Sequence, residues 1–121
     1  MGYALVMTPE VRTWLHDLRH RDQPSAILVG QAIGMLLEAG PELGRPLADR
    51  IQHSRLRNLK ELRPGSAGRS EIRILYIFDP RRNAVLLVAG DKAGRWDAWY
   101  RQAIPLAEQR YEDYLKQEGI Q

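Results

Sequence analysis

The sequence predicts a single α/β domain of the α+β kind, built on a small, mainly antiparallel sheet. Two apolar runs, at residues 72–78 and 84–89, are rich in Ile, Val and Leu and are bounded by Pro, Gly, Asp and Asn, which is typical of buried strands. Helical apolar patterns precede these strands, at about residues 9–39, and follow them from about residue 95. The predicted order of elements over residues 1–121 is β-α-α-β-β-β-α.

The N-terminal third is predicted to form a short strand and a helical hairpin that covers one face of the sheet. Tyr3–Met7 can be the strand. Thr8–Glu10 is a helix start, with Thr as N-cap and Pro in the first helical position. The second helix is expected to end at Gly40. Its Gly30 and Gly34 lie one turn apart, and we expect them to permit close packing against another backbone.

Three strands are predicted in the middle of the chain. Residues 56–63 are more polar than the two apolar runs, which indicates a strand nearer an edge, with Arg63 and Lys60 on opposite faces. In residues 72–78 apolar side chains occupy both faces, as expected of a strand that is covered on both sides. Residues 43–54 are expected to be irregular, because a glycine and a proline within them prevent a long element.

A helix is predicted from about Arg95 to the C-terminus, with an interruption. Pro105 would end or kink this helix, or begin a new one. Trp96 and Tyr100 are i, i+4 neighbours and are expected to lie together in the core, whereas Trp99 is expected to point elsewhere.

Composition limits the classes of protein that fit. The chain has no cysteine, which excludes disulfides, thiolate chemistry and cysteine zinc sites and fits a cytoplasmic protein. We find no signal segment and no membrane span. The net charge is only +3, but residues 55–101 contain eleven Lys and Arg against five Asp and Glu. This excess suits a polyanion-binding site or an ordinary solvated face.

Neither a metal site nor a nucleotide site is expected. His16 and His20 stand four residues apart, which suits two metal ligands on a helix, but no further His or Cys cluster completes a site. The glycine-containing loop at residues 65–68 lacks the Lys and Ser/Thr of a phosphate-cradling loop.

A group of basic residues and one tyrosine falls at the ends of the predicted strands and the start of the last helix. RNA cleavage without a metal needs a base for the 2′-hydroxyl, an acid for the leaving 5′-oxygen and cations around the phosphate. Lys and Tyr can be base or acid where positive neighbours lower their pKa, and Arg can hold the phosphate. These residue types fit that chemistry without requiring it. The group comprises Arg63, Arg69, Arg73, Lys92, Arg95 and Tyr100.

Four segments, KELRPGS, GRSEIRILYIFDP, AVLLVAGDKAG and WYRQAIPLAEQRY, together resemble the RelE/ParE toxin superfamily, and most closely its HigB-like, phage-derived branch. The resemblance implies a small sheet flanked by an N-terminal helical hairpin and a C-terminal helix. It also implies the toxin of a type II toxin–antitoxin pair, a ribosome-dependent endoribonuclease that cleaves messenger RNA in the ribosomal A site without a cofactor. A cognate antitoxin, often a helix-turn-helix DNA-binding protein in this branch, would neutralise it.

The resemblance carries four catalytic candidates to this chain. Arg73 matches the arginine at the start of the third strand, and Arg63 matches a basic residue that closes the second; both would hold the scissile phosphate. Lys92 matches the basic residue that leaves the last strand, and Tyr100 matches a catalytic tyrosine. The family pattern is not complete here, because no histidine follows Lys92 and Ala93 replaces an arginine.

Four further cations are candidates for binding the RNA backbone, namely Arg69, Arg95, Arg57 and Lys60. Two other functions stay open at this point. A ParE-like protein would inhibit DNA gyrase by binding alone and would need no Lys/Tyr pair. A non-enzymatic interaction module would use its basic face to dock an acidic protein. A shared fold does not separate these possibilities.

Overall fold

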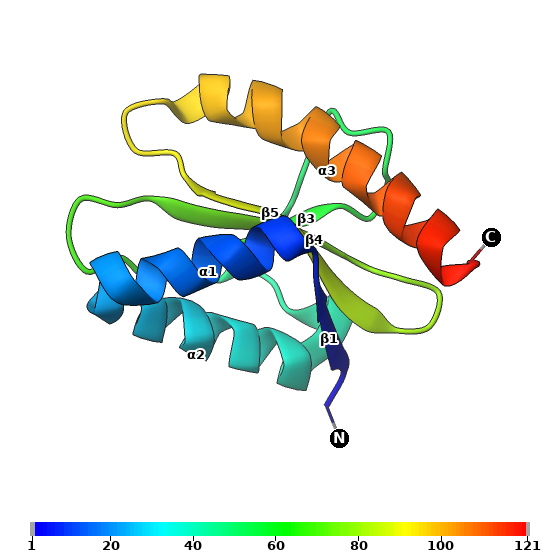
Figure 1. The fold of residues 1–121 in the computed structure, drawn as a ribbon, viewed down its shortest axis with the longest axis horizontal. Coiled ribbons are helices and arrows are strands. Elements are labelled where there is room, and N and C mark those ends of the chain that lie inside the picture. Colours follow the sequence, from blue (N-terminus) through cyan, green and yellow to red (C-terminus); the bar gives the residue numbers. More distant parts are fainter. Residues whose placement is uncertain (1, 121) are drawn as a thin grey trace.

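The structure is a computed structural model that describes residues 2–120, and it shows a five-stranded sheet in the order β1-β5-β4-β3-β2 (Figure 1). The elements are β1 (Ala4–Met7), β2 (Ala48–Arg50), β3 (Lys60–Leu62), β4 (Ile72–Phe78) and β5 (Asn83–Asp91). β1 pairs with β5 in parallel, and every other pairing in the sheet is antiparallel. The predicted α/β fold with a mainly antiparallel sheet is confirmed.

Helices cover both faces of the sheet. The hairpin of α1 (Pro9–Arg21) and α2 (Gln23–Ala39) packs on one face, and α3 (Trp96–Glu118) crosses the other (Figure 1). None of the helices in the described part of the chain is long and apolar enough to cross a membrane.

The ends of the N-terminal helices follow local capping rules. The backbone N–H of Val11 donates to Thr8 Oγ1 over 3.2 Å at the start of α1. The N–H of Ser25 likewise donates to Asp22 Oδ1 over 3.2 Å at the start of α2. Such caps satisfy N–H groups that have no partner within the helix. α2 ends at Gly40 with φ 72°, and a short 3₁₀ helix, η1 (Gly40–Glu42), follows.

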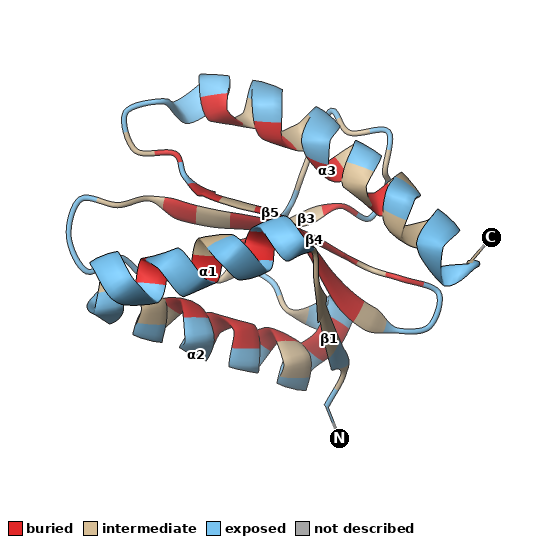
Figure 2. Ribbon diagram, in the orientation of Figure 1, coloured by how far each residue is buried: buried red, intermediate tan, exposed pale blue. Residues whose placement is uncertain are grey.

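The central strands separate two apolar cores, and Figure 2 shows buried residues along both β4 and β5. Ile74 and Tyr76 point to the α1–α2 side, whereas Leu75 points to α3. A bulge between the pairings of Leu75 and Tyr76 places Leu87 and Val88 of β5 on the same α3-facing side. Apolar runs with side chains on both faces were therefore correctly interpreted as strands covered on both sides.

The structure adds a short strand to the predicted order. Residues 48–50 form β2 inside the segment expected to be irregular, and β2 pairs with β3 over three residues. β3 itself is confined to residues 60–62 rather than spanning 56–63. Three-residue strands have too few positions to show a periodicity, so only pairing with a neighbouring strand defines them.

Pro105 does not end α3, which continues from Trp96 to Glu118 and contains the proline (Figure 1). A proline inside a helix costs about 3 kcal/mol, because it removes one hydrogen bond and crowds the preceding turn. Buried side chains anchor the helix on both sides of Pro105, and each large one contributes about 1.5–3 kcal/mol. These anchors are Trp99, Ala103, Ala107 and Tyr111.

The expectation that Gly30 and Gly34 pack against another backbone is wrong. Both glycines are exposed, and a Cβ added at either would meet nothing within 4 Å. α2 buries the opposite side of the helix, including Val29 and Leu36. The glycines therefore lie on the outward side of α2.

Candidate functional site

Five polar side chains meet on the α3-facing side of the sheet, and we call them the Glu61 cluster. Three neighbouring strands and the first turns of α3 supply them. Antiparallel pairing places Arg73 of β4 opposite Gly90 of β5, and the N–H of Lys92 donates to the carbonyl of Glu71 over 2.9 Å. Residues far apart in the sequence are thus held at one end of the sheet. The cluster consists of Glu61, Arg63, Arg73, Lys92 and Tyr100.

Glu61 is the centre of the cluster, and it is only 3% exposed. The Tyr100 hydroxyl donates to its Oε1 over 2.6 Å. Arg63 donates to its Oε2 from Nε over 2.9 Å and from Nη2 over 2.8 Å. Arg73 Nε lies 3.8 Å from Oε1, on the side where Tyr100 binds. One carboxylate therefore organises the tyrosine and both arginines.

Arg63 is held by two carboxylates. Besides its paired bonds to Glu61, Nη2 donates to Asp49 Oδ2 over 3.2 Å. Burial alone would lower the pKa of Arg63, but the hydrogen bonds and charge of Glu61, with the charge of Asp49, raise it. Most of its donors are therefore engaged within the protein, and only Nη1 makes no hydrogen bond to another described residue.

Arg73 is fixed more firmly than a surface arginine, since its side chain is only 14% exposed. Nη1 donates to the Ile72 carbonyl over 2.8 Å, and Nη2 donates to Glu71 Oε2 over 3.2 Å. Its Nε is buried and has no hydrogen-bond partner among residues 2–120. A guanidinium held in this way provides positive charge at a defined place without reorganisation.

Lys92 is an almost buried lysine that lies against aromatic rings. It is 6% exposed, and its Nζ lies 4.1 Å from the centroid of the Trp96 ring and 5.1 Å from that of Tyr100. Burial lowers the pKa of Lys92, and the nearby charge of Arg73 lowers it further, against the opposing charge of Glu61. A lysine with a lowered pKa gives up its proton more readily than an exposed one.

Tyr100 holds its proton tightly. Burial, the hydrogen bond to Glu61 and the negative charge of Glu61 raise the pKa of the Tyr100 hydroxyl to about 12. The charge of Arg73 opposes this shift, but burial and Glu61 outweigh it. With this pKa, Tyr100 keeps its proton at neutral pH and donates it in the hydrogen bond to Glu61.

The aromatic residues at the start of α3 are arranged differently from the expectation. Trp99 is buried, at 5% exposed, whereas Trp96 is 56% exposed. Trp99 lies directly over Gly90, where an added Cβ would come 2.6 Å from Trp99 Nε1. Trp96 is the first residue of α3, and its i, i+4 relation to Tyr100 brings both rings against Lys92.

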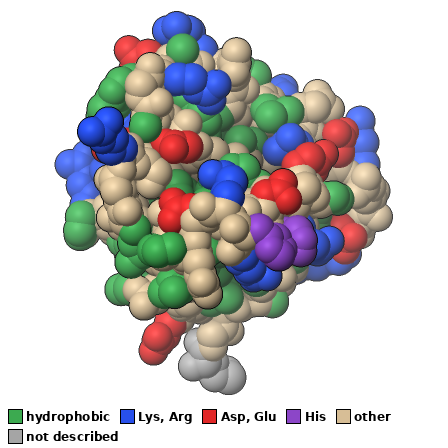
Figure 3. Space-filling view, turned by 60° about the vertical axis from the view of Figure 1, so that its left-hand side comes forward, with side chains coloured by type: hydrophobic (Ala, Val, Ile, Leu, Met, Phe, Trp, Pro, Cys, Tyr) green, Lys and Arg blue, Asp and Glu red, His purple; other side chains and the backbone are tan. Residues whose placement is uncertain are grey.

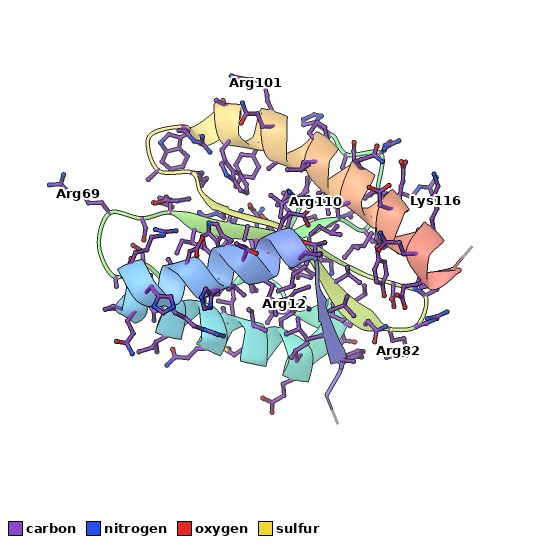
Figure 4. The ribbon with its side chains drawn as sticks, in the orientation of Figure 1. Arg12, Arg69, Arg82, Arg101, Arg110 and Lys116 are labelled. Atoms are coloured by element: carbon purple, nitrogen blue, oxygen red, sulfur yellow. The ribbon has the colours of Figure 1, made fainter. Side chains whose placement is uncertain are left out.

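The four predicted RNA-binding cations lie outside the Glu61 cluster. Arg57, Arg69 and Arg95 are exposed, and Arg69 projects outward from the loop between β3 and β4 (Figure 4). Lys60 points to the other side of β3, where its Nζ donates to the Pro41 carbonyl over 2.6 Å. Lys and Arg side chains are interspersed with acidic ones on the face shown in Figure 3. The cations thus do not form one continuous patch on this face.

Within residues 2–120 no group of three or more His, Cys, Asp or Glu side chains could hold a metal ion. His16 and His20 contact each other edge to face, with ring centroids 4.7 Å apart. A surface hollow of about 530 Å³ lies in the loop of residues 50–57, and no member of the Glu61 cluster lines it.

Sequence reasoning missed Glu61, although a signal for it exists. With period two, Glu61 shares the face of Leu59, and Leu59 is fully buried against α3. A buried carboxylate needs a positively charged partner. An acid at a buried strand position, with arginines nearby in the predicted sheet, therefore indicates a buried polar cluster.

The fold and the cluster define a class, a small α/β protein whose candidate site combines a buried carboxylate with a tyrosine, a lysine and arginines. Residues 14–112 match the family described as "Phage derived protein Gp49-like (DUF891)", and the chain belongs to this family. Two relatives come from Mycobacterium tuberculosis (strain ATCC 25618 / H37Rv). One, "Putative toxin HigB2", is 50% identical over 107 residues, which are 88% of this chain and 52% of that protein. The other, "Putative toxin HigB3", is 47% identical over 115 residues, 95% of this chain and 96% of that protein.

The chain thus spans about half the length of the first relative and nearly all of the second. No solved structure matches the chain significantly. The resemblance to the HigB-like, phage-derived branch is confirmed by the family match and both relatives.

Proposed function

We propose that this protein is the toxin of a type II toxin–antitoxin system and that it cleaves messenger RNA on the ribosome without a metal ion. The observation that carries the proposal is the 2.6 Å hydrogen bond from Tyr100 to the buried Glu61, with Arg73 and Lys92 beside it. Membership of the Gp49-like family and the names of the two relatives support a toxin.

In the proposed reaction the ribose 2′-oxygen attacks the adjacent phosphorus and the bond to the 5′-oxygen breaks. The products are a 2′,3′-cyclic phosphate and a 5′-hydroxyl. Glu61 is too buried to contact RNA, so it acts through Tyr100. The Tyr100 oxygen accepts the proton of the 2′-hydroxyl while its own proton passes to Glu61 Oε1.

The other two members have complementary roles in this proposal. Lys92 donates a proton to the leaving 5′-oxygen, a role that suits an ammonium whose pKa is lowered by burial. Arg73 stabilises the extra negative charge on the phosphate in the transition state, since its charge is already fixed beside Glu61. Arg63 keeps Glu61 in place through its paired hydrogen bonds.

We further propose that the protein acts in the cytoplasm and that a cognate antitoxin, of the helix-turn-helix DNA-binding kind, neutralises it. Exposed cations outside the cluster, such as Arg69 and Arg95, would contact the RNA backbone and would be covered or approached by the antitoxin. A purified complex with the antitoxin should therefore lose RNA binding and cleavage.

The test compares two Tyr→Phe variants on the same helix. Tyr100→Phe removes the hydroxyl that binds Glu61, whereas Tyr111→Phe removes one that makes no hydrogen bond to a described residue. Cleavage of messenger RNA on programmed ribosomes should slow by about a hundredfold or more for Tyr100→Phe. It should change little for Tyr111→Phe. If Tyr100→Phe cleaves nearly as fast as the wild type, Tyr100 does not transfer a proton.

A further inference from the structure

We propose that the exposed face of Trp96 is a stacking site for one nucleobase of the RNA, next to the phosphate that is cleaved. This inference rests on the proposed function and extends it by assigning a base-binding site that the catalytic cluster does not include. Three observations support it, namely the exposure of the indole, the way it is held and its distance from the cluster.

Trp96 leaves more than half of a large aromatic surface in water, since it is 56% exposed. The neighbouring Trp99 shows that this end of α3 can bury an indole against the sheet. Burying an aromatic side chain of this size is strongly favourable, so one left in solvent beside a polar site is suited to a ligand with its own flat surface.

The ring contacts Lys92 and stands on a backbone segment of defined conformation. Trp96 has φ 26°, a backbone conformation that residues other than glycine rarely adopt. Its N–H donates to the Lys92 carbonyl over 3.0 Å, as does the N–H of Arg95 over 2.9 Å. The Lys92 ammonium lies 4.1 Å from the ring centroid on one side. The ammonium lies against the ring, and the 56% exposure of Trp96 leaves aromatic surface for a base.

The distance to the cluster fits a nucleotide. The same ammonium lies 5.1 Å from the Tyr100 ring, so Trp96 and Tyr100 flank one lysine. A ribose that presents its 2′-hydroxyl to Tyr100 carries its own base, and the following nucleotide lies one phosphate away. Either base is within reach of the Trp96 ring, because only the Lys92 side chain separates that ring from Tyr100. Every base has a flat π-face, so this site would bind without strong preference for sequence.

The experiment is a kinetic double-mutant cycle on programmed ribosomes. The protein carries Trp96→Leu, with Trp96→Phe as a control that keeps an aromatic face. The messenger RNA carries, one at a time, an abasic nucleotide on either side of the cleaved phosphate, with its ribose and 2′-hydroxyl intact. Circular dichroism checks that each variant is folded.

With normal RNA, Trp96→Leu should lower kcat/KM about tenfold, and Trp96→Phe should lower it less than about threefold. With one of the two abasic RNAs, the wild type and Trp96→Leu should cleave at nearly equal rates, because the stacking partner is missing. Equal losses on all RNAs would mean that Trp96 only positions Lys92 or packs against another protein, and would overturn the inference. No loss on any RNA would also overturn it, while wild-type cleavage would leave the proposed function standing. If the wild type cleaves no RNA, the proposed function fails and this inference fails with it.

Discussion

Replacing Glu61 with Gln removes one negative charge from a side chain of almost the same shape, and we expect a large loss of stability. Glu61 is 3% exposed and accepts three hydrogen bonds, two of them from Arg63. Breaking a buried ion pair by removing one partner typically costs about 3–5 kcal/mol. Asp49 still binds Arg63 after the change, so we expect about 3 kcal/mol, at the lower end. Urea unfolding followed by circular dichroism measures the loss, and a slope of about 1.5 kcal/mol/M would lower the midpoint by about 2 M.

Glu71→Gln is the matched control for this change. Glu71 also binds an arginine, over 3.2 Å to Arg73, but its side chain is 40% exposed. Because the Glu71 carboxylate is well hydrated, unlike that of Glu61, we expect its replacement to cost less than about 1 kcal/mol. Glu61→Gln should also lower the pKa of Tyr100 from about 12 towards its ordinary value, as followed by tyrosinate absorbance. If both variants lose the same small free energy, Glu61 does not organise the cluster and the reasoning is refuted.

Three further predictions concern the fold and the RNA surface. Gly30→Ala should raise the free energy of unfolding by about 1 kcal/mol, because alanine favours the helix and nothing lies within 4 Å of the new Cβ; a lower melting temperature would contradict this. Asp79→Asn should cost about 1–3 kcal/mol at pH 7. Burial would raise the pKa of Asp79, but hydrogen bonds from Tyr114 and Asn83 lower it. The extra free energy of unfolding of the wild type should therefore be complete above about pH 4. It should vanish as the pH falls through the lowered pKa. A difference in stability that does not shrink as the pH falls below about 4 would argue against this role. Arg69→Ala should flatten the log–log salt dependence of ribosome binding by about 0.7, and an unchanged slope would mean that this arginine is merely solvated.

Much of the fold follows from local patterns in the sequence. Thr8 begins α1 and Gly40 ends α2, because capping depends on residues close in the chain. The strands β4 and β5 follow from apolar composition and length. The continuation of α3 through Pro105 does not follow, because burial against a distant sheet decides it. The position of Gly30 was misjudged since the sequence does not show which side of a hydrophobic helix faces the protein.

The candidate site was predictable in its members and less so in its arrangement. Arg73, Lys92 and Tyr100 were expected together, and antiparallel pairing brings them together. Glu61 was missed because its partners lie on other elements, and only the folded sheet brings them within hydrogen-bond distance. The raised pKa of Tyr100 has the same origin, since it comes from burial and from Glu61. Strand pairing between distant segments decides which charged residues become neighbours, and the spacing of residues along the chain does not show it.

The most direct test of the central claim, metal-independent cleavage of RNA at the Glu61 cluster, is to map new messenger RNA ends after induced expression. Wild-type protein should create 5′-hydroxyl ends within translated codons, paired with 2′,3′-cyclic phosphates. Arg73→Ala should create none while remaining folded by circular dichroism. The claim would be contradicted if Arg73→Ala were as toxic as the wild type and created as many new ends. Toxicity of the wild type without new ends would also contradict it, and would favour a gyrase-binding inhibitor instead.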